Sequence, residues 1–233
     1  MKEARYHKEN DIIWREPCLS EQSCRRNLGN PNIGATNVTF EQGEAIMDGI
    51  TAWIEYPRDM IHLCEPERPF SIRTKVYLTD TDASVFLQLY VSGVNLSREF
   101  RFMIAGVWPV AGNEDKLVLE LWDSSNNTAT EEVRGRVYNT ALTTLARDKW
   151  SEFVCTYDGR GGPTPEDGIC LYMDGVRVDD TDFTYTHGGA YTGMKYHSDL
   201  PLRVGQNVEG RMDFIEVWNR VLTPAECANL AGV

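Results

Sequence analysis

The sequence of 233 residues lacks several features that would narrow its function at once. It has no apolar run long enough to cross a bilayer, and residues 1–10 are polar where a signal peptide would need a hydrophobic stretch. Basic residues are few, with 23 Lys and Arg against 35 Asp and Glu, for a formal net charge of −12. Because such an acidic surface repels phosphate backbones, we expect no nucleic-acid binding, and because no apolar run is long enough we expect no membrane insertion.

Metal-binding cysteine motifs are also missing. No Cys-x-x-Cys pair occurs and the four histidines are scattered, which disfavours a zinc site. Six cysteines stand at positions 18, 24, 64, 155, 170 and 227, and the sequence does not choose their pairing. Cys155 and Cys170 lie on the two arms of an expected hairpin, so we expect them near each other across the ladder, bridged or reduced. Cys18 and Cys24 are close enough for a local bridge.

Alternating apolar and polar residues predict a mainly β protein. The alternation is clearest in residues 70–78 and 85–91, where each strand has one core face. Further strands are expected at 45–47, 52–56, 100–107, 117–122, 133–139, 149–157, 169–173, 200–204 and 212–218. Helical periodicity appears only after Thr223, which forms a capping box with Glu226 around Pro224. The length, the 42% hydrophobic content and the lack of an internal repeat favour one sandwich domain.

Three segments together resemble the laminin G-like and concanavalin A-like jelly-roll families. Residues 200–230 give a strand, a glycine turn, a strand with one aspartate, Asn-Arg-x-Leu and a short helix. Residues 149–176 are similar to the central hairpin of these families, and residues 43–49 to their entry strand. The resemblance implies an all-β, two-sheet antiparallel jelly-roll sandwich (concanavalin A-like) with a short C-terminal helix over residues 35–233. Residues 1–34 would then form an irregular arm that packs on the sandwich or on a neighbour.

The resemblance leaves the function open, because such folds carry lectins, polysaccharide hydrolases and lyases, adhesion modules and coat proteins. The hydrolases that share the fold place paired carboxylates on one strand in a Glu-x-Asp-x-x-Glu motif. The nearest approach in this chain is Glu120 with Asp123, whose spacing of three puts the carboxylates on opposite faces of a strand. We interpret Glu120 as a solvent-facing residue and Asp123 as the start of a turn. We therefore expect no enzymatic activity.

Residues 185–197 are the best ligand candidate, since they combine three tyrosines, two histidines and three glycines without a strand period. Aromatic faces suit sugar rings, and loops at one rim of a sandwich are where recognition concentrates. The alternative is that these tyrosines cover the edge of the core. Two tryptophans outside the segment are expected to be exposed as well. The predicted ligand-binding residues are Tyr185, His187, Tyr191, Tyr196, His197, Trp108 and Trp122.

We expect no cofactor, with Ca²⁺ as the one ion that the loops could hold. Loop aspartates supply the hard oxygens that Ca²⁺ prefers, although no recognised calcium loop is present. The aspartates concerned are Asp80, Asp82, Asp179, Asp180 and Asp182. Asp48 and Asp213 are expected to be structural. Asp213 shares a strand face with the apolar Ile215 and Val217, so either a metal or hydrogen-bond donors must satisfy its charge, and we favour backbone or side-chain donors.

Three function classes follow. The first is a virion surface protein, a bacteriophage decoration or fibre component whose arm fastens it to a coat protein, and the intact Met1 and missing signal favour this class. The second is a secreted, lectin-like carbohydrate-binding module. The third, which is disfavoured, is a polysaccharide hydrolase or lyase. We expect the partner to be a glycan or a coat protein, the location to be the virion surface or extracellular, and the chain to be able to form homo-oligomers.

Overall fold

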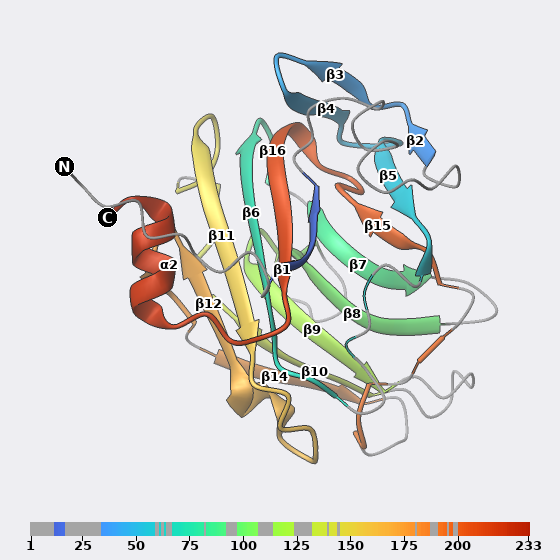
Figure 1. The fold of residues 1–233 in the computed structure, drawn as a ribbon, viewed down its shortest axis with the longest axis vertical. Coiled ribbons are helices and arrows are strands. Elements are labelled where there is room, and N and C mark those ends of the chain that lie inside the picture. Colours follow the sequence, from blue (N-terminus) through green and yellow to red (C-terminus); the bar gives the residue numbers. More distant parts are fainter. Residues whose placement is uncertain are drawn as a thin grey trace.

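The alternating segments assemble into two antiparallel sheets in the computed structural model (Figure 1). The structure describes residues 12–16, 34–58, 61, 63, 67–81, 83–91, 97–106, 114–123, 132–138, 140–143, 145–179, 181–186, 191–194, 196, 197 and 200–233. For residues 12–16, 91, 97 and 181–186 it describes the backbone alone. No helix in these parts of the chain is long and apolar enough to cross a membrane.

Each sheet has eight strands among the described residues. Sheet A has the order β13-β12-β11-β6-β16-β4-β3, and β1 pairs with β16 as well. Its strands are β1 (Ile12–Glu16), β3 (Thr39–Glu41), β4 (Glu44–Asp48), β6 (Phe70–Leu78), β11 (Trp150–Tyr157), β12 (Ile169–Met173), β13 (Val176–Arg177) and β16 (Glu209–Trp218). Sheet B has the order β14-β10-β9-β8-β7-β15-β5-β2. Its strands are β2 (Gly34–Thr36), β5 (Trp53–Tyr56), β7 (Val85–Val91), β8 (Ser97–Ile104), β9 (Leu117–Asp123), β10 (Glu132–Val137), β14 (Thr181–Thr186) and β15 (Leu202–Val204).

The apolar faces of the two sheets meet in one core. In β6, Ile72 and Val76 are fully buried while Arg73, Lys75 and Tyr77 are half-buried on the outer face, as the period of two predicts. The centre of the core is aromatic, because Phe86 of sheet B stacks on Phe153 of sheet A with ring centroids 5.2 Å apart. Burial of each such ring stabilises the fold by roughly 2–3 kcal/mol.

The predicted bounds of β6 and β7 are confirmed, but five strands were missed: β1, β2, β3, β13 and β14. All five lie at an edge of their sheet and pair with a single neighbour. An edge strand takes its hydrogen bonds from one partner and needs only a weak apolar pattern of its own. The alternation of apolar and polar residues in such a short edge strand is therefore too weak to predict the strand. The expected strand at 100–107 is also shifted, since β8 is Ser97–Ile104.

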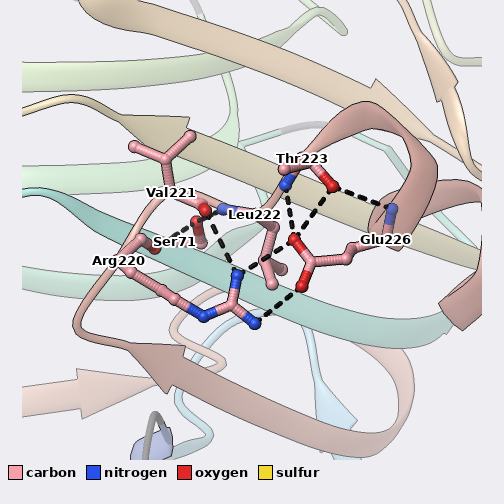
Figure 2. A network of polar contacts seen from close by, with 6 residues as sticks. All are labelled: Ser71, Arg220, Val221, Leu222, Thr223 and Glu226. Atoms are coloured by element: carbon pink, nitrogen blue, oxygen red, sulfur yellow. Dashed lines mark hydrogen bonds and ion pairs between the residues drawn. The ribbon is translucent and has the colours of Figure 1, made fainter. Parts of the chain in front are cut away.

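The short C-terminal helix is confirmed as α2 (Pro224–Ala231), with Thr223 as its N-cap. Figure 2 shows the capping box, in which the Thr223 hydroxyl accepts from the Glu226 amide and the Glu226 carboxylate accepts from the Thr223 amide. The helix packs on the outer face of sheet A, where Cys227 and Leu222 join Trp218 in a buried apolar cluster. Gly232 ends the helix in the left-handed conformation, with φ 80°.

A β-bulge in β16 overturns the expected position of Asp213. The register with β6 shifts between Met212 and Phe214, so one extra residue enters the strand there. Met212 and Ile215 both face the core, while Asp213 lies on the outer side with 40% of its side chain exposed. Its carboxylate pairs with Lys75 Nζ at 3.4 Å. The expectation of a side-chain donor is confirmed, but the shared face with Ile215 is wrong.

The expected proximity of Cys155 and Cys170 is also wrong. Cys155 is opposite Leu171 in the β11–β12 ladder, and Cys170 is opposite Thr156, so the two cysteines are offset by one residue. Because side chains alternate along a strand, Cys155 points into the core while Cys170 packs on the α2 side. Both are free thiols. Residues 18, 24 and 64 lie outside the described part of the chain.

Candidate recognition site

The predicted ligand segment, residues 185–197, is not one continuous loop. Tyr185 lies in β14, opposite Val133 of β10, so the segment begins as a strand and the expectation of a loop there was wrong. His187 and Trp108 lie outside the described residues, and for Tyr185 only the backbone is described. The predicted residues whose side chains are described are Tyr191, Tyr196, His197 and Trp122.

Three carboxylates fix the second half of this segment to the sandwich. Each accepts a hydrogen bond from a backbone amide: Glu67 from Met194 (2.8 Å), Asp123 from Thr192 (2.6 Å) and Glu99 from His197 (2.9 Å). Hydrogen bonds to a charged acceptor contribute more than those between neutral groups, about 1.5–3 kcal/mol each. Described residues between 191 and 197 are therefore held in a defined conformation rather than left to fold around a ligand.

Tyr191 is structural rather than exposed. Its side chain is 3% exposed, and its hydroxyl donates to Glu67, which also accepts from the Tyr157 hydroxyl at 2.6 Å. Burial is the main cause that raises the pKa of both phenols well above their ordinary value, so both stay protonated and keep donating. The Tyr157 hydroxyl in turn accepts from the Gly161 amide at 2.9 Å. The prediction that Tyr191 is available to a ligand is wrong, because Glu67 draws its hydroxyl inward.

Tyr196 lies on a fixed arginine. The Arg58 guanidinium lies 4.5 Å from the centre of the Tyr196 ring and donates to Glu99 through two nitrogens, Nη2 at 2.7 Å and Nε at 3.1 Å. Arg58 also donates to the backbone oxygens of Ile61 and His197. Bidentate pairing of this kind fixes the plane of the guanidinium. Tyr196 is 37% exposed, which makes it the most exposed aromatic residue among those described.

His197 is buried, at 5% exposed, so its predicted place on an open loop is wrong. The backbone of His197 is what the fold uses: its amide donates to Glu99 and its carbonyl accepts from Arg58. These two backbone contacts fix the residue in its buried position. Of the predicted residues with described side chains, Tyr196 alone is exposed.

Trp122 is fully buried, which contradicts its expected exposure. It lies on the outer face of sheet B, where its ring is 5.8 Å from that of Tyr90 and 4.5 Å from the Arg98 guanidinium. Val118 and Val133 belong to the same buried cluster. Aromatic and apolar side chains from neighbouring strands enclose the ring. Its burial could not be predicted from the residues of β9 alone.

Glu120 and Asp123 confirm one expectation and overturn another. They lie on opposite sides of β9, since Glu120 pairs with Arg101 at 2.8 Å whereas Asp123 accepts from Thr192. Glu120 is however fully buried rather than solvent-facing, and it accepts a further hydrogen bond from Trp122 Nε1 at 3.3 Å. Two carboxylates on opposite faces cannot act on one glycosidic bond.

The loop aspartates have protein partners where they are described. Asp179 accepts from Arg177 at 2.8 Å and from the Leu171 amide at 3.1 Å. Asp48 is confirmed as structural, because it accepts three backbone amides and the Thr51 hydroxyl, and these hydrogen bonds, led by that of Thr51, lower its pKa. Residues 82 and 180 lie outside the described part, as does the side chain at 182. Within the described part no group of three His, Cys, Asp or Glu side chains is arranged to hold a metal.

The residues that build the site were not found from the sequence. Glu99 reaches Arg58 across 41 positions, and Glu67 reaches Tyr191 across 124. The only signal was indirect: a carboxylate within an expected strand, as at Glu99, needs a partner if it is buried. Nothing in the sequence identifies that partner, since it comes from a different loop.

Two antiparallel sheets that pack face to face, followed by a short C-terminal helix, define a jelly-roll sandwich. The profile of the concanavalin A-like lectin/glucanases superfamily matches residues 48–228, and the chain belongs to that superfamily in its laminin G form. No curated protein matches the sequence. The resemblance seen in the sequence is thus confirmed for most of the chain.

Solved structures agree on the fold. The binding domain of botulinum neurotoxin DC in complex with rat synaptotagmin II has a TM-score of 0.54 and 11% identity, covering 96% of this chain and 52% of that one. The same domain in complex with SialylT has a TM-score of 0.51 and 11% identity, covering 86% and 46%. Domain 4 of AbnA, an extracellular GH43 arabinanase from Geobacillus stearothermophilus solved with arabinotriose, has a TM-score of 0.49 and 14% identity, covering 85% and 82%. The chain spans about half the length of the neurotoxin domains.

Proposed function

We propose that the protein is a non-catalytic recognition module that binds a glycan on the exposed Tyr196 side chain. The observation that carries the proposal is the mounting of this ring: it is the most exposed aromatic side chain described, and Arg58 and Glu99 fix the plane beneath it. An aromatic face that is held still loses little entropy when a sugar ring packs on it. The neurotoxin domain solved with SialylT supports the ligand class for this fold and says nothing of the position of the site.

A glycan array followed by titration calorimetry tests the proposal. We expect Tyr196→Ala to weaken binding of the best glycan about ten-fold, which corresponds to about 1.4 kcal/mol, and Tyr196→Phe to stay within about two-fold because it keeps the ring. Ile50→Ala is the matched control, since Ile50 is 78% exposed and its replacement should leave both binding and stability unchanged. An array without binding, or equal affinity for the wild type and Tyr196→Ala, would refute the proposed site.

The non-catalytic part of the proposal has its own test. The separation of Glu120 and Asp123 on opposite faces of β9 supports it, because it removes the nearest approach to an acid pair. We expect no reducing sugar and no unsaturated product when the protein is incubated with a panel of neutral and acidic polysaccharides. Release of either product, retained after a second chromatographic purification, would contradict this part.

The location on a virion surface and the coat-protein partner stay predictions from the sequence. Mass spectrometry of purified particles from the source would detect this chain at a fixed ratio to the coat protein if the location is right. A lectin-like module outside any particle would instead be found in the culture medium. Either result leaves the Tyr196 test unaffected.

A further inference from the structure

The outer face of sheet A has two ends with different environments. Near α2 it is buried: Trp218 is 2% exposed, and Arg73 lies between Glu152 and Glu216 at 2.6 and 3.1 Å. At the other end of the same strands, Tyr77 and Trp150 are only half-buried. This second end lies at the top of β11, β6 and β16 in Figure 1, away from the helix.

Four outward-facing residues form one row across this end. The register places Trp150 beside Tyr77, Tyr77 beside Arg211, and Arg211 beside Ile46. Neighbouring strands are about 4.8 Å apart, so the row extends for about 14 Å. The Tyr77 and Trp150 rings meet edge to face with centroids 5.9 Å apart, and Lys75 Nζ lies 5.5 Å from the centre of the Trp150 ring.

A hollow of about 390 Å³ opens at Tyr77, between β6, β16 and β4. Its lining includes Ile46, Thr79, Glu209 and Arg211. Gly210 forms part of it with φ +140°, and a Cβ at that position would come within 2.0 Å of the Tyr77 carbonyl oxygen. Only glycine lets β16 approach β6 so closely. The volume lies within the range of pockets that hold small ligands.

The two cations of this surface, Lys75 and Arg211, are each paired with a carboxylate, while Glu209 accepts from the Thr79 hydroxyl at 3.0 Å. Lys75 pairs with Asp213 at 3.4 Å, and Arg211 with Glu44 at 3.3 Å. An anionic ligand would have to break one of these pairs to reach a cation, and a cationic ligand would be repelled by Lys75 and Arg211, whereas hydroxyl groups can donate to the carboxylates and accept from the cations while both pairs persist. The bulge at Asp213 is what brings its carboxylate to this surface.

We infer that this end of sheet A binds a neutral oligosaccharide. One sugar ring packs its C–H face on Tyr77 and Trp150, and the next lies over the hollow, where its hydroxyls meet Glu209 and Arg211. Aromatic side chains beside convergent polar groups are the usual composition of a sugar-binding surface. This site lies on sheet A, whereas the residue that precedes His197, Tyr196, is held near Glu99 of sheet B. The two proposed sites are therefore independent, and each can be tested without the other.

Chemical-shift mapping on the full chain tests the inference. Cellohexaose, maltohexaose, laminarihexaose and xylohexaose are titrated against ¹⁵N-labelled protein while the Trp150 indole resonance is followed. At least one of these neutral probes should shift that resonance in a saturable way. Its affinity should fall at least ten-fold in Tyr77→Ala and about five-fold in Arg211→Ala. It should not change in Tyr196→Ala or when NaCl is raised from 50 to 500 mM.

Arg211→Ala is the variant that tests binding without disturbing the fold, because the Arg211 side chain is 52% exposed. It should keep the wild-type melting temperature even if Tyr77→Ala does not fold. Hexagalacturonate and chitohexaose-derived glucosamine oligomers serve as anionic and cationic probes and should bind at least ten-fold more weakly. The inference is overturned if no neutral probe shifts the Trp150 resonance, if Arg211→Ala binds like the wild type, or if a charged probe binds more tightly.

Discussion

Glu226 joins the end of β16 to α2, and its replacement by glutamine gives a test with a distinctive pH signature. Its carboxylate accepts from the Thr223 amide (2.8 Å) and hydroxyl (2.9 Å) and from two nitrogens of Arg220 (2.9 and 2.8 Å) (Figure 2). The Arg220 carbonyl in turn accepts from the Ser71 hydroxyl, which accepts from the Leu222 amide. Chiefly because of the Arg220 hydrogen bonds, the pKa of Glu226 falls from 4.5 to about 2.

The pKa of Glu226 is lower in the folded than in the unfolded chain, so the charged carboxylate stabilises the fold. This contribution is complete above pH 4.5 and is lost as the pH falls towards 2. The difference in pKa corresponds to about 3 kcal/mol at most, and solvent screening of a pair at the surface reduces it to about 1 kcal/mol. Less than half of it should remain at pH 3.

Urea denaturation of the wild type and Glu226→Gln at pH 7, 5, 4 and 3 measures the effect. We expect a gap of about 1 kcal/mol in the free energy of unfolding at pH 7, equivalent to about 2–4 °C in melting temperature, which closes as the wild-type carboxylate is protonated. Thr223→Ala is the control: it should lose about 1 kcal/mol from the cap while keeping most of the pH dependence, since Arg220 remains. A gap that is absent at pH 7, or that stays constant down to pH 3, would refute the reasoning.

Three further outcomes are expected. Glu67→Ala should lower the free energy of unfolding by about 3 kcal/mol, because it leaves the Tyr191 hydroxyl and other buried donors without an acceptor. Trypsin should then cut the variant first within residues 191–197, and resistance equal to that of the wild type would contradict this. Phe153→Ala should cost about 3–5 kcal/mol in urea denaturation, because its ring fills the aromatic centre of the core, and a loss below 1 kcal/mol would be incompatible with that packing. Burial raises the pKa of the Cys227 thiol to about 12, so at pH 8 iodoacetamide should label Cys227 and Cys155 only after unfolding, as mapped by peptide mass spectrometry; rapid labelling of the native protein would show that α2 opens.

The sequence was sufficient to predict those features that depend only on residues close together in the chain. The alternation in β6 and β7 identified both strands with their bounds, and the Thr223, Pro224 and Glu226 spacing identified the start of α2. Each of these depends on a period of two or on a contact three residues away. The family resemblance added the two-sheet architecture.

Tertiary structure decided everything that depends on register or on a distant partner. A single inserted residue at the bulge moved Asp213 to the outer surface, and an offset of one position separated Cys155 from Cys170. Glu67 drew Tyr191 inward from 124 positions away, whereas Arg58 held Tyr196 at the surface. The sequence alone determined which residues alternate and where the helix begins, because those properties are local. Which tyrosine is open to a ligand depends on which carboxylate or cation the folded chain places beside it, and only the packing of two sheets determines that.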